Sequence, residues 1–150
     1  MRRYEHLADL RALVGEPLGD SDWLIVDQAR IDRFADATED RQWIHVDPQR
    51  AALGPFGAPI AHGFLTLSLL PVFFESAYAI ADVRMAVNYG LDRVRFTAPV
   101  PVGSRLRARF TLKRWDAIEG GAQLGIEAVI ERDGAAKPVC IAESLIRCFT

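Results

Sequence analysis

The segment from residue 61 to about residue 78 constrains the fold more than any other feature of the chain. Its residues are apolar nearly all round a helix, which is the pattern of a helix that other elements cover on most sides. The longest apolar stretch, Ile60 to Phe74, is too short to span a bilayer and contains His62 and Pro71. We therefore predict a long buried helix with a kink at Pro71, because proline lacks the N–H that a helix needs.

From residue 83 onward, the sequence pattern changes from helical to alternating, with Gly90 as one interruption. Short turns such as Asp133-Gly134 make neighbouring strands antiparallel and leave one apolar face. Only the helix at 61–78 is large enough to cover this face. The sequence therefore predicts an α+β fold in which an antiparallel sheet wraps around a long central helix. The predicted strands cover residues 83–96, 105–113, 123–131 and 139–149, the last as a central strand.

The first 60 residues predict shorter elements around an irregular loop at 38–47. No internal repeat, low-complexity tract or linker interrupts the chain, so residues 1–150 are predicted to form one domain. The predicted elements are a helix over Glu5–Val14, a short strand at Trp23–Val26, a helix through Ala37 that Asp27 caps, and one or two helical turns over 48–53.

Composition and charge narrow the class of partner. A chain of 150 residues, half of them hydrophobic, can bury a core without a disulfide or a metal ion. The formal charge of -2 gives no basic field for a nucleic-acid backbone. Cys140 and Cys148 are eight positions apart in one predicted strand, too far for a disulfide, which fits a reducing cytoplasm. With no signal peptide or membrane segment recognised, a small molecule or a protein is the expected partner.

Two proton-handling residues, Asp40 and His45, lie five positions apart in the 38–47 loop. A carboxylate and an imidazole at this spacing can converge on one water molecule, and histidine accepts or returns a proton near neutral pH. That arrangement indicates a hydration or hydrolysis site; the alternative is that both are surface residues or turn formers. The turn at His62 and Gly63 opens the central helix, and the free N–H groups there could hold a developing oxyanion.

Three motifs occur in order along the chain: Asp40-Arg-Gln-Trp-Ile-His45-Val-Asp47-Pro48, then Ile60-Ala-His62-Gly63-Phe64, then residues 89–96 with 98–103. Together they resemble the motifs of the MaoC-like dehydratases, the (R)-specific enoyl-CoA hydratases, and especially the branch related to the nodulation protein NodN. The resemblance covers roughly residues 8 to 148.

The resemblance implies a hot-dog fold, a homodimer and an acyl chain held in a tunnel. It also implies that Asp40 and His45 activate the water that adds to C3 of a trans-2-enoyl thioester, while the backbone N–H of Gly63 holds the thioester oxygen. No metal or redox cofactor is expected. Coenzyme A is part of the substrate and is therefore not counted as a cofactor. The substrate is an acyl-CoA or an acyl-carrier thioester, and neither nucleic acid nor membrane is an expected partner.

Two positions depart from the family pattern. Glu39 stands where glycine commonly precedes the catalytic aspartate, and it puts a second negative charge beside Asp40. Gln42-Trp43 stands where Asn-Pro is common, and the Gln42 amide can still orient a neighbouring group.

Other polar residues are weaker candidates. Gln42, His62 and Asn88 are candidates for substrate binding, although a hydrogen bond at the turn is favoured for His62 and strand-end packing for Asn88. His45, Asp47 and His62 lack the close spacing of a metal-binding motif, so no metal site is expected.

A row of basic residues marks one face of the strand at 105–113. We expect a solvated or dimer-facing surface, with contacts to coenzyme A phosphates or an acidic carrier protein as the functional alternative. The residues are Arg105, Arg107, Arg109 and Lys113, with Arg93 and Arg95 nearby in the sequence.

Two other functions remain open: a hot-dog thioesterase, in which water attacks the carbonyl carbon, and a non-catalytic acyl-binding or dehydratase subunit.

Overall fold

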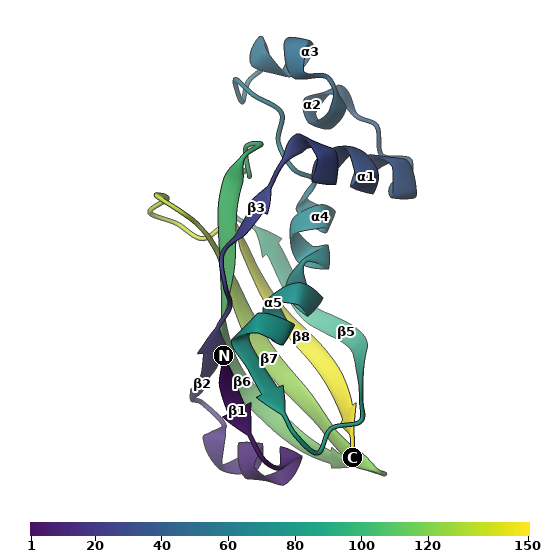
Figure 1. Ribbon diagram of the computed structural model, residues 1–150, viewed down its shortest axis with the longest axis vertical. Coiled ribbons are helices and arrows are strands. Elements are labelled where there is room, and N and C mark those ends of the chain that lie inside the picture. The colour runs from purple at the N-terminus through teal and green to yellow at the C-terminus, as the bar shows by residue number, and fades with distance from the viewer.

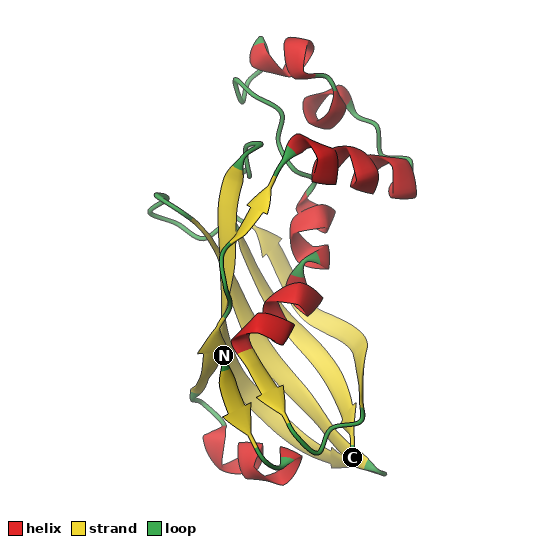
Figure 2. Cartoon of the chain, viewed as in Figure 1, coloured by secondary structure: helices red, strands yellow, loops and turns green.

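The computed structural model describes residues 1–150 and shows a curved sheet with two successive helices crossing its concave face (Figure 1). Three further helices gather beyond one end of the sheet (Figure 2). The elements are β1 (Arg2–Tyr4), a 3-10 helix η1 (Leu7–Leu13), β2 (Pro17–Asp20), β3 (Leu24–Val26), α1 (Gln28–Thr38), α2 (Trp43–Val46), α3 (Pro48–Ala52), α4 (Gly63–Ser68), α5 (Leu70–Ala77), β4 (Tyr78–Ile80), β5 (Met85–Phe96), β6 (Ser104–Ile118), β7 (Gly121–Arg132) and β8 (Cys140–Phe149).

The main sheet has the order β2-β6-β7-β8-β5, and all its pairs are antiparallel, as predicted. β3 also pairs with β6, and β1 pairs with β4 in a separate parallel ladder. The side chains of β6, β7 and β8 alternate between the two faces of the sheet, as the period-two pattern predicts, and those on the inward face are buried. These residues are Leu106, Ala108, Phe110 and Leu112 on β6, Leu124, Ile126, Ala128 and Ile130 on β7, and Cys140, Ala142, Ser144, Ile146 and Cys148 on β8.

Gly90 does not end a strand. β5 continues through it to Phe96, and the pairing with β8 shifts register at Gly90 and again near Asp92. The glycine therefore marks an irregularity in one long strand instead of a boundary between two.

The predicted long central helix is two helices, α4 and α5, which meet at Leu69. Pro71 lies in the first turn of α5, where a missing N–H is tolerated, so the proline begins a helix here rather than kinking one. The inner side packs into the core through Leu65, Leu70 and Phe73. The outer side is not covered by this chain: Phe64 is 68% and Val72 is 40% exposed.

The N-terminal region differs from the prediction in detail. The segment expected to be an α-helix at Glu5–Val14 is the 3-10 helix η1, which still buries Leu7 and Leu10. α1 begins as predicted, because the Asp27 side chain accepts a hydrogen bond from the backbone N–H of Arg30 at 2.9 Å. Both cysteines are free and buried on β8. No helix combines the length and the hydropathy needed to cross a membrane.

Candidate active site

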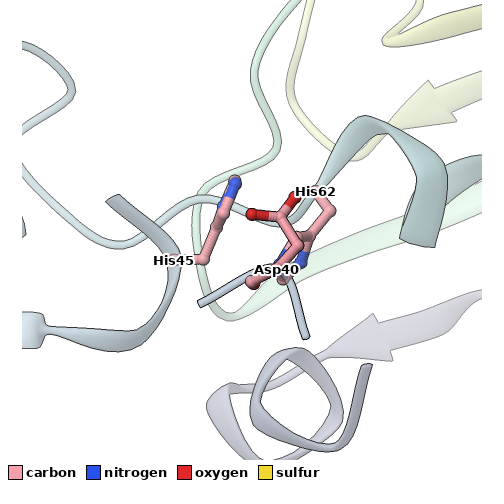
Figure 3. Close-up of side chains that lie close together, drawn as sticks. All are labelled: Asp40, His45 and His62. Carbon is pink, nitrogen blue, oxygen red and sulfur yellow. The ribbon is translucent and has the colours of Figure 1, made fainter. Parts of the chain in front are cut away.

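Asp40, His45 and His62 converge where α1, α2 and the start of α4 meet. One side-chain ligand atom from each of the three residues lies within 4.8 Å of those from the other two. Figure 3 shows the Asp40 carboxylate beside both imidazole rings. His45 lies on the one-turn helix α2, so the segment expected to be an irregular loop is partly helical. The spacing of five nevertheless brings Asp40 and His45 together, because Asp40 lies in the connection before that turn.

His45 is held as a neutral base. Its Nδ1 is 2.6 Å from the carbonyl oxygen of Ile60, and since a carbonyl only accepts, Nδ1 carries the proton and Nε2 is the free acceptor. The ring is 6% exposed, and this burial lowers its pKa from 6.5. The nearby His62 also lowers the pKa, whereas the bond to Ile60 and the Asp40 carboxylate act in the opposite direction.

His62 connects the two candidate residues. Its Nε2–H donates to the backbone carbonyl of Asp40 at 2.9 Å, which fixes the main chain that carries the carboxylate. Its ring stacks on that of His45, with 3.8 Å between centroids and 25° between planes. The ring is 2% exposed, and its Nδ1 has no hydrogen-bond partner.

Gly63 begins α4, so its N–H has no acceptor within the helix. It lines a cavity of about 370 Å³ together with Ile60, Thr66 and Phe96. A Cβ atom at this position would lie 2.8 Å from the Phe96 ring, so the wall of the cavity requires glycine. Asp40 and His45 do not line this cavity, but Ile60, whose carbonyl binds His45, does.

The other candidates for substrate binding lie apart from this cluster. Gln42 is the exposed N-cap residue of α2, and its side chain makes no capping bond there. The amide that holds α2 comes instead from Gln28 on α1, whose Nε2 donates to the His45 carbonyl and to Asp32, both at 2.8 Å. Asn88 lies on β5 and lines two cavities beside α5. Sequence reasoning missed Gln28, because nothing in the pattern of α1 distinguishes it from a solvated polar residue.

Known proteins resemble this chain over most of its length. Residues 9–131 match the family model described as "MaoC like domain". The chain is 52% identical to 3-hydroxyacyl-thioester dehydratase Z of Mycobacterium tuberculosis, over 98% of each chain. The chain belongs to the MaoC-like family.

A further relative and a solved structure also resemble this MaoC-like chain. It is 49% identical to nodulation protein N of Rhizobium leguminosarum bv. viciae, over 91% of this chain and 86% of that protein. The solved structure of R-hydratase PhaJ1 from Pseudomonas aeruginosa superposes with a TM-score of 0.78 at 22% identity, covering 97% of this chain and 86% of that one. The predicted hot-dog fold and the kinship with the nodulation protein are both confirmed.

The backbone at Glu39 has a conformation that favours glycine, the residue that commonly precedes the aspartate in the MaoC-like motif. Glu39 caps the C-terminal end of α1 with φ of 60°, and it is the one non-glycine residue with positive φ. Glycine adopts this left-handed conformation at no steric cost. The departure from the family pattern therefore places backbone strain directly before Asp40.

Replacing Glu39 with glycine is expected to raise the free energy of unfolding by about 0.5–1 kcal/mol, because relief of the left-handed strain exceeds the entropy that glycine adds to the unfolded chain. Urea unfolding measures the change. The matched control is Glu119→Gly, an exposed glutamate with negative φ, which is expected to destabilise. A lower stability for Glu39→Gly would contradict the strain.

One ring nitrogen of each histidine in this MaoC-like site is already bonded. The Nδ1 atom of His45 bonds to Ile60 and the Nε2 atom of His62 to the Asp40 carbonyl, so His45 Nε2, His62 Nδ1 and the Asp40 carboxylate are the atoms that could hold an ion. Asp47, the third residue of the metal set considered from sequence, caps α3 by accepting from the Arg50 N–H at 3.0 Å.

The predicted basic face of β6 is partly neutralised. Arg105 pairs with Asp133 at 3.1 Å, and both Arg107 and Arg109 pair with Glu131. These side chains project from the face of β6 opposite the buried residues, away from α4 and α5. Exposed pairs of this kind contribute little to stability. Two carboxylates thus face three arginines and Lys113, so this face of β6 keeps a net positive charge.

Proposed function

We propose that this chain is an (R)-specific enoyl-thioester hydratase that also works in reverse as a 3-hydroxyacyl-thioester dehydratase. The observation that carries the proposal is the convergence of the Asp40 carboxylate on a buried, neutral His45, whose bond from Nδ1 to the Ile60 carbonyl leaves Nε2 as the acceptor. The unpartnered N–H of Gly63 at the adjacent helix start supports it. So do the 52% identity to a protein named as a dehydratase and the matching fold of a solved R-hydratase.

In the hydration direction, Asp40 and His45 bind one water molecule, and their basic atoms accept hydrogen bonds from its two hydrogens. One of them takes a proton as the water oxygen forms a bond to C3 of the trans-2-enoyl thioester. The electron pair of the double bond moves toward the thioester oxygen, where the Gly63 N–H stabilises the enolate charge. The proton then returns to C2 on the same face, so all atoms of water end in the 3-hydroxyacyl product. These steps use side chains and one backbone group, and the proposal includes no metal or redox cofactor.

Incubation with crotonyl-CoA tests this function. Hydration removes the absorbance of the enoyl thioester without releasing free thiol, and the product is (R)-3-hydroxybutyryl-CoA. Release of free thiol would instead identify a thioesterase. No change in either signal would identify a non-catalytic acyl-binding protein.

The pH dependence of kcat/KM is expected to reflect His45. The neutral imidazole is the active base, and its pKa lies below 6.5 because the ring is buried. The acid limb of the pH profile should therefore have its midpoint below pH 6.5. A pH–rate profile with crotonyl-CoA measures this. An acid limb centred above pH 6.5 would contradict the burial of His45 as the factor that sets its protonation.

We also propose that the chain forms a homodimer through β5. This strand is one edge of the sheet, and all of its residues except Val94 are exposed. A long open edge with exposed apolar residues favours pairing with another strand. A second copy can cover it across a twofold axis, because both copies then present the same surface. The exposed apolar residues are Met85, Val87, Tyr89, Leu91 and Phe96, with Phe64 and Val72 on the adjoining helices.

Sedimentation equilibrium is expected to give twice the chain mass of 16.7 kDa. Phe64→Glu should weaken association at least tenfold, because it places a charge in the centre of the surface that the partner covers. Val14→Glu, at an exposed apolar residue outside this surface, should leave the dimer intact. A monomer at all concentrations would contradict the proposed assembly.

The location and the thioester carrier are also proposals. Two free buried cysteines suit a reducing compartment, and we propose the cytoplasm. The substrate carrier is coenzyme A or an acyl carrier protein, and the paired arginines of β6 favour neither.

A further inference from the structure

Three cavities follow one another along the side of α4 and α5 that faces β5. The first includes Gly63 and Thr66, the second Leu67, Ser68 and Pro71, and the third Pro71 and Phe74. The same succession runs backward along β5, from Phe96 through Leu91 to Asn88 and Ala86. The second and third cavities measure about 370 and 300 Å³. An acyl chain whose thioester lies at Gly63 has this route along the helices.

The second cavity is more polar than its neighbours. Ser144 is only 4% exposed, lines this cavity, and makes no side-chain hydrogen bond within the chain. It is the one hydroxyl among the inward-facing residues of β8, which otherwise are cysteine, alanine and isoleucine. The residue is buried but its hydroxyl reaches the cavity, so a ligand there can supply the hydrogen bond that the chain does not.

Asn88 brings a second free polar group to the same cavity. Asn88 pairs with Ile146 in the β5–β8 ladder. Ser144 lies two residues before Ile146 on β8 and is opposite Leu91. Asn88 and Ser144 are therefore diagonal neighbours on one face of the sheet, about 7–8 Å apart, and their side chains can reach a common atom between them. The Asn88 amide also makes no hydrogen bond within the chain and lines both the second and third cavities.

The helix break faces this polar pair. Pro71 has no N–H, and the carbonyl of Leu67 instead accepts from the Leu69 N–H where α4 ends. Leu67 and Pro71 both line the second cavity. The Asn88 amide and the Ser144 hydroxyl thus lie in the same cavity as the turn between α4 and α5. A group that both donates and accepts hydrogen bonds matches this set.

We propose that the second cavity binds a hydroxyl group carried part-way along the acyl chain of the substrate. The assignment rests on the proposed function, which places the thioester at Gly63. From Gly63 to Ser68 the helix rises by about 7.5 Å, so the hydroxyl lies several carbons beyond the reacting double bond. Ser144 and Asn88 are the specificity residues in this assignment, and they do not touch the reacting atoms.

The test compares the affinities of octanoyl-CoA and of its derivatives with a hydroxyl at C6, C7 or C8, measured by calorimetry. These saturated thioesters bind without turnover. One hydroxylated thioester should bind about fivefold to tenfold more tightly than octanoyl-CoA, as one or two added hydrogen bonds provide. Ser144→Ala and Asn88→Leu should each remove most of this preference and leave octanoyl-CoA binding as tight or tighter. The corresponding trans-2-octenoyl-CoA thioesters should show the same preference in kcat/KM.

Ser68→Ala is the matched control. Ser68 lines the same cavity, but its hydroxyl already donates to the Phe64 carbonyl at 2.7 Å, so its removal should leave the preference unchanged. The proposal is overturned if no hydroxylated thioester binds more tightly than octanoyl-CoA, or if the preference survives both substitutions. Hydration of crotonyl-CoA is a separate result, because that short chain does not reach the cavity and tests the proposed function alone.

Discussion

Asp40→Asn is expected to lower kcat for crotonyl-CoA hydration by about 10³-fold, within the range of 10²–10⁴ typical of general acid–base catalysis. The asparagine side chain has nearly the same shape but cannot accept a proton, so the water loses one of its two bases. The backbone carbonyl at position 40 still accepts the hydrogen bond from His62, so the local main chain is expected to remain in place. Initial rates at saturating crotonyl-CoA measure the effect.

Asp36→Asn is the matched control for this experiment. Asp36 is an exposed carboxylate near the end of α1, and it pairs with Arg41 at 3.2 Å outside the cluster. Its replacement should leave kcat unchanged. If Asp40→Asn retains kcat within tenfold of the parent while its circular dichroism is unchanged, Asp40 has no role as a base in the reaction.

Gly63→Ala is expected to lower kcat by about 10²-fold. Its Cβ would lie 2.8 Å from the Phe96 ring, so either the ring or the start of α4 must move. Movement of the helix start displaces the N–H that faces the developing oxyanion, and loss of one such donor typically costs 10²–10³-fold in kcat. The loss should appear in kcat more than in KM, because this hydrogen bond strengthens in the transition state.

Phe96→Leu distinguishes a steric cause from a direct one. If the Cβ acts by pressing on the ring, the double variant Gly63→Ala with Phe96→Leu should recover about tenfold in kcat relative to Gly63→Ala, with Phe96→Leu alone as the baseline. An unchanged kcat for Gly63→Ala would contradict the expected displacement of the helix start.

The sheet was predictable from the sequence because its period-two pattern records which face is buried. The strand β2 was missed, since Pro-Leu-Gly-Asp has the composition of a turn and becomes a strand only through pairing with β6. The break at Leu69 was also missed. Pro71 signals a lost hydrogen bond, but whether the helix bends or restarts depends on the packing of both halves against the sheet.

The meeting of Asp40 and His45 was predictable from the sequence. Their spacing in one segment indicated that the two side chains converge, and the structure brings them together. The sequence does not show which nitrogen of His45 is free, because that depends on the carbonyl of Ile60, fifteen residues away. The sequence also predicted the basic face of β6, but it did not show that Glu131 and Asp133 form ion pairs with those arginines. Hydrogen-bond and ion-pair partners that belong to a different helix or strand become known only from the fold.

The most direct measurement is a crystal structure of the Asp40→Asn variant with bound crotonyl-CoA. The mechanism predicts that the thioester oxygen lies 2.7–3.1 Å from the backbone nitrogen of Gly63. It also predicts that C3 of the acyl chain faces a water molecule held between the side chains at positions 40 and 45. A thioester bound elsewhere, or a C3 atom turned away from His45, would contradict the assignment of this site to hydration.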